Sequence, residues 1–187
     1  MRVISGSKKG HRLLAPKNNK SRPTEDKIKE AVFNILYPIK DNCLVLDLFA
    51  CTGSIGVEFL SRGAKKVYFS EINPSNISLL RENLDKTHFL DDAVILRGSF
   101  LRNLERVDDS IDYVYIDPPY KSDYYEKALN FMVNSQLFYN SKFIVEEDKL
   151  LDYSDKISEL AMVFQRKYGR KVITIYERKK NESNLPR

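Results

Sequence analysis

The segment Asp117-Pro118-Pro119-Tyr120 directly follows a short apolar run, Ile111–Ile116. An exocyclic base amine is a poor nucleophile, because its lone pair is delocalised into the base, so acceptors must hold its N–H groups and turn the lone pair outward. The carboxylate of Asp117 and the carbonyl of Pro118, whose backbone the double proline restricts, can be those acceptors. Tyr120 offers a ring on which an extruded base can stack. These residues predict methyl transfer to a base amine; an ordinary Pro-Pro turn is the bland alternative.

A second group of residues, Asp47 to Gly56, begins at the end of another apolar run. Its glycines would let a ligand approach the backbone, although a turn and a tight helix contact explain them equally well. Glu71 lies 24 residues after Asp47, where an acidic side chain can accept both hydroxyls of an adenosine ribose. The carboxylate of Asp47 would repel a pyrophosphate but suits the ammonium of an amino acid. Cys51 stands where the first glycine of a dinucleotide fingerprint would be.

This combination favours S-adenosylmethionine over a dinucleotide as the cofactor, with S-adenosylhomocysteine as the product. The sulfonium supplies an activated methyl group, so neither a metal nor a covalent protein nucleophile is required. We predict the following cofactor-binding residues: Asp47, Phe49, Ala50, Cys51, Thr52, Gly53, Glu71, Ile72, Ser99 and Phe100. For Ser99 and Phe100 an ordinary loop is an equally good interpretation. Glu146 and Glu147 either line the pocket or are solvated.

Alternating strand and helix patterns must position these groups. The patterns predict strands at 44–49, 67–69, 93–96, 111–116 and 143–145, and helices at 54–62, 74–86 and 124–133. Such repeated units predict an α/β fold, a doubly wound, mainly parallel sheet covered by helices on both faces. Residues 161–167 and 171–176 flank Tyr168-Gly169-Arg170 and predict a terminal antiparallel hairpin. Because ligands bind outside the carboxyl ends of parallel strands, both groups should meet at one edge of the sheet.

The first 40 residues have a different character. Short apolar pairs mixed with Gly6, Gly10 and basic residues predict a small hairpin and a loop within residues 1–20. Thr24 is a plausible N-cap for a following amphipathic helix, with Asp26 in its first turn. We therefore expect an appendage at residues 1–40, docked on a catalytic domain at residues 41–187.

Charge is unevenly distributed along the chain. Residues 1–29 carry a net charge of +7 and residues 165–187 carry +6, whereas the whole chain carries +5, so the middle carries −8. Two basic ends on an acidic body are expected if the ends contact a polyanion while the body holds a pocket. Charge alone is equally compatible with solvated basic tails.

Length and composition exclude several classes of protein. A chain of 187 residues, 42% hydrophobic and 30% charged, is expected to bury one core and to fold on its own. No apolar run approaches the roughly 18 residues that span a bilayer, and the start has no apolar signal core, which predicts a cytoplasmic location. Cys43 and Cys51 are the only cysteines and no His cluster accompanies them, so we expect no disulfide and no metal site.

Taken together, these motifs resemble those of the RsmD-type 16S ribosomal RNA guanine-N2 methyltransferases, within the Rossmann-like methyltransferases. The resemblance rests on Arg2-Val3-Ile4-Ser5-Gly6 with Gly10 and Arg12, Arg22-Pro23-Thr24 with Asp26-Lys27, Asp47-Leu48-Phe49-Ala50, Glu71 and Asp117-Pro118-Pro119-Tyr120. It departs from the family pattern at Cys51-Thr52, where Gly-Ser is usual, and by lacking an acidic residue near Ser99.

The resemblance implies a seven-stranded sheet with a reversed final strand, methyl transfer from S-adenosylmethionine to a guanine N2 amine, and ribosomal RNA or the small ribosomal subunit as partner. It also implies that Arg12, Arg22, Thr24 and Lys27 contact RNA and that Asp117, Pro118 and Tyr120 are catalytic. We expect a monomer, although the sequence does not fix the oligomeric state. Two alternatives remain. One is an adenine-N6 DNA methyltransferase, for which the chain lacks room for a target-recognition domain; the other is a non-catalytic RNA-binding ribosome-assembly protein.

Overall fold

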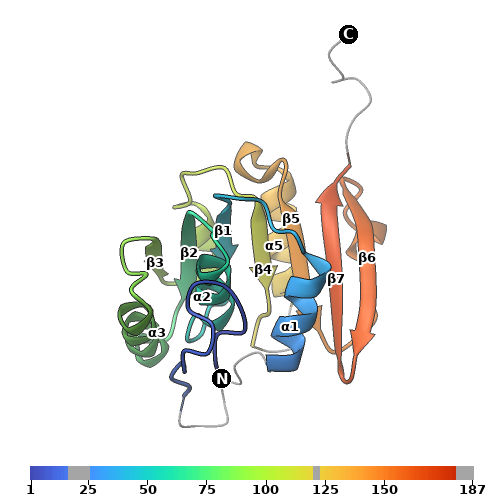
Figure 1. The fold of residues 1–187 in the computed structure, drawn as a ribbon. Coiled ribbons are helices and arrows are strands. Elements are labelled where there is room, and N and C mark those ends of the chain that lie inside the picture. The colour runs from blue at the N-terminus through green and yellow to red at the C-terminus, as the bar shows by residue number, and fades with distance from the viewer. Residues whose placement is uncertain (17–25, 120–122, 180–187) are drawn as a thin grey trace.

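A computed structural model describes residues 1–16, 26–119 and 123–179 (Figure 1). Its helices are α1 (Asp26–Ile35), α2 (Ser54–Ser61), α3 (Pro74–Thr87), α4 (Phe100–Leu104) and α5 (Tyr124–Val133), with 3-10 turns η1 (Gln136–Phe138) and η2 (Tyr153–Asp155). Its strands are β1 (Leu44–Asp47), β2 (Lys66–Glu71), β3 (Ala93–Arg97), β4 (Tyr113–Ile116), β5 (Lys142–Glu147), β6 (Leu160–Tyr168) and β7 (Lys171–Arg178). The expected strands and helices are confirmed; the short helix α4, where an ordinary loop had been the alternative, was not predicted.

The strands form one seven-stranded sheet in the order β3-β2-β1-β4-β5-β7-β6. Strands β1 to β5 pair in parallel, and β7 pairs antiparallel with both β5 and β6. The hairpin β6–β7 forms the edge farthest from β3 (Figure 1). This arrangement confirms the doubly wound sheet closed by a C-terminal hairpin.

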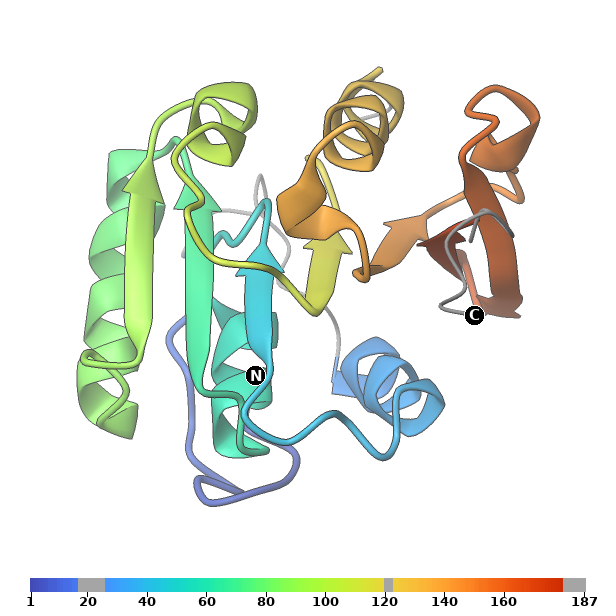
Figure 2. The same cartoon turned by 90° about the horizontal axis from the view of Figure 1, so that it is seen from above.

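Hydrophobic cores lie on both faces of the sheet. One contains the apolar faces of α1, α2 and α3, and the other contains those of α4 and α5. Figure 2 shows α1 and α2 on one side of the sheet and α5 on the other. Among the described residues, no helix is long and apolar enough to cross a membrane.

The N-terminal segment forms a hairpin-like pair that docks on α2. Arg2 and Arg12 make an antiparallel bridge, and the Val3 N–H donates to the His11 carbonyl over 2.9 Å. The Ser7 N–H then donates to the carbonyl of Ser61, in the last turn of α2, over 2.7 Å. The small hairpin predicted for this segment is thus present, and it is fastened to the sheet domain by backbone hydrogen bonds.

A buried ionic cluster reinforces this docking. The carboxylate of Glu58, on α2, is fully buried and accepts hydrogen bonds from the N–H groups of Ile4 over 2.7 Å and Ser5 over 3.0 Å. Arg62 Nε lies 2.8 Å from one of its oxygens, and Lys29 Nζ lies 3.7 Å from the other. Burial lowers the pKa of Lys29, and the neighbouring Glu58 opposes that shift. The cluster therefore ties α1, α2 and the N-terminal hairpin together.

We expect Glu58→Ala to lower the free energy of unfolding by about 3 to 5 kcal/mol, because it leaves Lys29 buried without its carboxylate. Urea denaturation measures the loss. Glu82→Ala is the matched control: Glu82 also pairs with a lysine, Lys86, but both side chains are about half exposed, at 52% and 47%. Exposed pairs contribute little, so equal losses in the two variants would contradict a special role for the buried cluster.

Candidate active site

The pairing of β1 with β2 and β4 brings the predicted chemistry to one edge of the sheet. Asp47, the last residue of β1, pairs with Phe69 of β2 and with Tyr115 of β4. Glu71, two residues beyond Phe69, is the last residue of β2, and Asp117, two residues beyond Tyr115, comes directly after β4. The three carboxylates therefore lie at the carboxyl ends of adjacent strands. This edge is where parallel α/β sheets bind ligands.

The loop after β1 has a tight, left-handed backbone. Cys51 (φ 51°) and Gly53 (φ 79°) both adopt positive φ, which is uncommon for a non-glycine residue. Asp47 fixes the start of α2, because its Oδ2 accepts a hydrogen bond from the Gly56 N–H over 3.1 Å. A Cβ at Gly56 would lie 2.1 Å from the Phe69 ring, so this glycine is required for packing of α2 on β2. The interpretation of Gly56 as a tight helix contact is therefore confirmed.

Two buried polar side chains, Asn83 and Thr52, lie at the loop after β1. Asn83, on α3, donates to the Thr52 carbonyl over 2.9 Å and bonds the backbone of Leu14 through both amide atoms. It thereby fixes the loop to the N-terminal segment, a role that the sequence had not indicated. The Thr52 hydroxyl oxygen is buried and has no hydrogen-bond partner among the described residues. An unsatisfied hydroxyl in this loop is the kind of group that a bound ligand would satisfy.

Glu71 is held rigidly at the end of β2. Its Oε1 accepts hydrogen bonds from the N–H groups of Ile72 over 2.8 Å and Asn73 over 2.7 Å. Ile72 is 68% exposed, so it presents an apolar surface beside this carboxylate. The arrangement leaves Glu71 able to accept further hydrogen bonds, and its role as a ribose acceptor stays a prediction.

Aromatic rings gather next to the loop. The rings of Phe49 and Phe100 lie 5.2 Å apart, and Tyr124, at the start of α5, stacks parallel to Phe49 at 6.1 Å. Ser99 is the N-cap residue of α4 and makes no side-chain cap. Asn103 fixes the approach to α4 by donating to the carbonyls of Leu96 over 2.9 Å and Gly98 over 3.1 Å. Phe49 and Phe100 are predicted site residues, and nothing in the sequence indicates that Tyr124 and Asn103 lie beside them.

Glu146 and Glu147 are 2% and 5% exposed, so the solvated interpretation of these residues is wrong. Glu146 accepts a hydrogen bond from the Tyr115 hydroxyl and lies 3.1 Å from the ammonium of Lys171. The same ammonium lies 3.8 Å from Asp117. The sequence places Lys171 in the terminal hairpin and in the basic C-terminal end but does not connect it with Asp117, because only the antiparallel pairing of β7 with β5 brings it here.

Burial sets the electrostatics of the two aspartates. It raises the pKa of Asp47 to about 7, an effect that the Gly56 hydrogen bond partly offsets. It raises the pKa of Asp117 to about 8, with a further contribution from the negative charge of Glu146, while Lys171 opposes the shift. Strongly raised pKa values of this kind are common for carboxyl groups at functional sites.

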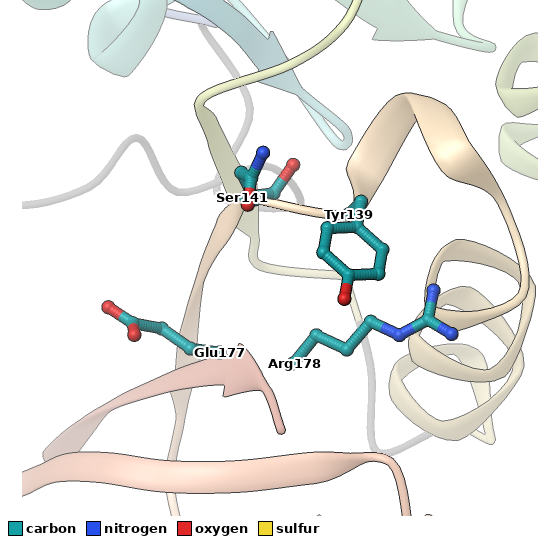
Figure 3. A pocket seen from close by; sticks show the side chains of 5 residues that line it. Tyr139, Ser141, Glu177 and Arg178 are labelled. Carbon is teal, nitrogen blue, oxygen red and sulfur yellow. The ribbon is translucent and has the colours of Figure 1, made fainter. Parts of the chain in front are cut away.

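Other predicted site residues lie apart or outside the described regions. Arg12 and Lys27 are exposed on the N-terminal hairpin and on α1. Tyr120, Arg22 and Thr24 fall outside the described residues. A depression of about 240 Å³ at the opposite edge of the sheet is lined by Tyr139, Asn140, Ser141, Glu177 and Arg178. Figure 3 shows the Arg178 side chain beside the Tyr139 ring, with its guanidinium 4.7 Å from the ring centroid. None of the predicted site residues lines this depression.

A family model described as "Conserved hypothetical protein 95" matches residues 1–177. The chain belongs to this family. Its relatives include the Bacillus subtilis protein named "Putative rRNA methyltransferase YlbH", 33% identical over 96% of this chain and 100% of that protein. They also include the Haemophilus influenzae protein named "Ribosomal RNA small subunit methyltransferase D", 34% identical over 80% of this chain and 79% of that protein.

Solved structures show the same fold. The structure titled "Putative methyltransferase yhhF from Escherichia coli" superposes with a TM-score of 0.81 at 23% identity, covering 95% of this chain and 97% of that one. Membership of the family confirms the resemblance to the RsmD-type methyltransferases and the Rossmann-like fold that it implied. The chain therefore belongs to a methyltransferase family. The loop after β1 and Asp117 lie at the edge of the sheet where parallel α/β folds generally bind ligands.

The titration of Asp47 gives a test of the site's electrostatics. A carboxyl whose pKa is raised on folding stabilises the native state less as pH rises from its unfolded value to its folded one. Asp47→Asn should therefore match the unchanged protein near pH 4 and exceed its free energy of unfolding by roughly 4 kcal/mol above pH 7, and the difference should grow as the pH rises from 4 to 7. Urea denaturation across this pH range measures it. A pH-independent difference would mean that Asp47 is not buried as a proton-binding group.

Proposed function

We propose that this protein transfers a methyl group from S-adenosylmethionine to the exocyclic N2 amine of a guanine in 16S ribosomal RNA. The observation that carries the proposal is the position of Asp117, just beyond the carboxyl end of β4 and next to the loop after β1, whose buried Thr52 hydroxyl has no hydrogen-bond partner in the described part of the chain. The names of the relatives, which include ribosomal RNA small subunit methyltransferases, support ribosomal RNA as the substrate.

The residues around the loop fit the proposed cofactor. Asp47 would face the ammonium of the methionine part, and the backbone from Ala50 to Gly53, with the Thr52 hydroxyl, would supply hydrogen bonds. Glu71 would accept the ribose hydroxyls, while Ile72, Ser99 and the Phe49–Phe100 aromatic pair would contact the adenine. When bound, the sulfonium of S-adenosylmethionine supplies a methyl group activated for displacement.

The work of the chain's own residues is to orient the amine. Asp117 and the Pro118 carbonyl would accept its N–H groups, which turns the lone pair toward the methyl group and keeps water from competing. Such positioning can contribute about 7 to 11 kcal/mol. Tyr120, proposed here to stack on the base, would hold the ring in the plane that these two acceptors require.

We assign RNA binding to residues 1–40 and catalysis to residues 41–187. The exposed Arg12 and Lys27, together with Arg22 and Thr24, would contact the phosphate backbone. The partner would be ribosomal RNA, either free or in a small-subunit particle. This protein would bind it as a monomer in the cytoplasm.

The decisive experiment is transfer of a tritiated methyl group from S-adenosylmethionine to small ribosomal particles from a strain deficient in their methylation. Nucleoside analysis should find the label in N2-methylguanosine. Label in N6-methyladenosine would replace guanine with adenine as the target. Absence of labelled RNA, with bound cofactor detected by calorimetry, would overturn the proposed activity on this substrate.

We expect Glu71→Ala and Asp117→Ala to fail in different ways. Glu71→Ala should weaken binding of S-adenosylmethionine by about 1 to 3 kcal/mol, because it removes a charged acceptor for the ribose hydroxyls. Asp117→Ala should abolish turnover with less effect on cofactor affinity, since its proposed partner is the base amine. Calorimetry and single-turnover methylation measure the two effects. Unchanged affinity in the first variant, or near-normal turnover in the second, would remove that residue from its proposed role.

Neutralising Arg12, Arg22 and Lys27 together should raise the RNA concentration for half-maximal methylation. It should also flatten the dependence of log affinity on log salt by up to about 0.7 to 0.9 per lost phosphate contact. Cofactor affinity should stay the same. A matched control neutralises Lys86, Lys142 and Lys156, which are exposed and paired with carboxylates elsewhere. If both triple variants keep their folding temperature and show the same salt slope, the N-terminal residues do not bind the substrate.

A further inference from the structure

Lys171, the first residue of β7, reaches a group of carboxylates at the carboxyl edge of the sheet. Its ammonium lies 3.1 Å from Glu146, 3.4 Å from Asp148 and 3.8 Å from Asp117. The side chain is 34% exposed, whereas that of Glu146 is 2% exposed. A single ammonium thus serves three carboxylates, of which Glu146 is buried, Asp117 is partly buried and Asp148 is exposed.

The sheet register explains why these groups meet. Glu146 of β5 pairs with Ile173 of β7, and Lys171, two residues away, points to the same face of the sheet. On β4, Asp117 lies two residues beyond Tyr115, and the Tyr115 hydroxyl donates to Glu146 Oε2. Lys171, Glu146 and Asp117 therefore share one face, with Glu146 between the other two. Glu146 is held from both sides, by the hydroxyl at one oxygen and by the ammonium at the other.

We propose that Lys171 is a positioning residue for methyl transfer, which favours the ionised, amine-accepting form of Asp117 by neutralising the Glu146 carboxylate beside it. The kinetic consequence rests on the proposed function, whereas the effect of Lys171 on the ionisation of Asp117 does not depend on any substrate. Without Lys171, two carboxylates on one face would compete for a proton, as like charges at close range do.

The charges around Asp117 come from each element packed against it. Glu146, Asp47, Asp148 and Lys171 lie on or next to β5, β1 and β7, and the Tyr125 hydroxyl approaches from α5. Lys171 is the cation among these groups, and it opposes the rise in the pKa of Asp117 that burial and Glu146 cause. Removing it should raise that pKa further, and removing the charge of Glu146 should lower it.

The first test is direct titration without RNA or cofactor. Carboxyl carbon NMR of ¹³C-aspartate-labelled protein, with the Asp117 signal assigned through Asp117→Asn, should show its midpoint rising by about one to three pH units in Lys171→Met. Lys171→Arg should leave the midpoint close to its original value. Adding Glu146→Gln to Lys171→Met should bring it back down. Lys86→Met, which breaks an exposed ion pair on α3, is the control and should not move it.

The second test is the pH dependence of kcat for methylation of ribosomal particles. Because the ionised form is the better acceptor, the acid limb in Lys171→Met should move to higher pH by the same interval. On that limb the rate should fall roughly tenfold for each pH unit by which the midpoint rises. The rate should recover at high pH. A merely structural role would lower kcat at every pH without moving the limb.

The two tests separate the inference from the proposed function. An unmoved Asp117 midpoint in a folded Lys171→Met protein overturns the inference, whatever the activity. A moved midpoint with no methylation of ribosomal RNA by the unchanged protein overturns the proposed function and leaves the electrostatic linkage standing. A moved midpoint with an unmoved kinetic limb shows that the protonation of Asp117 does not control transfer, and it overturns the positioning role.

Discussion

The parallel pairing of β1 with β2 on one side and β4 on the other is the constraint on which the site depends. A parallel ladder aligns the carboxyl ends of neighbouring strands, so residues separated by many tens of positions in the chain end at one edge. Asp47, Glu71 and Asp117 meet for this reason. The Leu48 N–H donates to the Tyr115 carbonyl and the Ala50 N–H to the Ser70 carbonyl, so the pairing continues into the loop itself. A slip of one residue would turn Asp47 and Asp117 to the opposite face of the sheet.

Concentrating carboxylates at that edge opposes folding, and the structure limits the cost in two ways. Asp47 uses its carboxylate to hold the first turn of α2, whereas Asp117 and Glu146 share the ammonium of Lys171. Lys171 can reach these carboxylates because β7 runs in the reverse direction, so that its first residue, rather than its last, lies at the carboxyl edge. The terminal hairpin therefore extends the sheet and also supplies a charge to the site.

The N-terminal segment is linked to the loop after β1 by side-chain hydrogen bonds from α1 and α3. Lys29 Nζ contacts the Arg2 carbonyl at 2.5 Å and the hydroxyl of Ser54, the residue after Gly53, at 3.2 Å. Asn83 joins Leu14 to Thr52 from the other side. The segment that carries the exposed Arg12 and the loop after β1 therefore share the hydrogen-bond partners Lys29 and Asn83, which links their positions.

The sequence by itself determined the order of strands and helices, the terminal hairpin and the two motifs at the edge of the sheet, because hydrophobic periodicity and turn residues act locally. It also named Phe49 and Phe100 as candidate site residues, whose roles stay predictions. Only the tertiary structure decided the partners of buried polar groups: Glu58 with Lys29 and the first hairpin, Asn83 with the loop after β1, and Lys171 with Asp117 and Glu146. These contacts join segments distant in the chain, and a lysine that opens a strand has the same local pattern whether it faces water or a buried carboxylate. Its role follows from strand order and register, which the ladder between β5 and β7 sets.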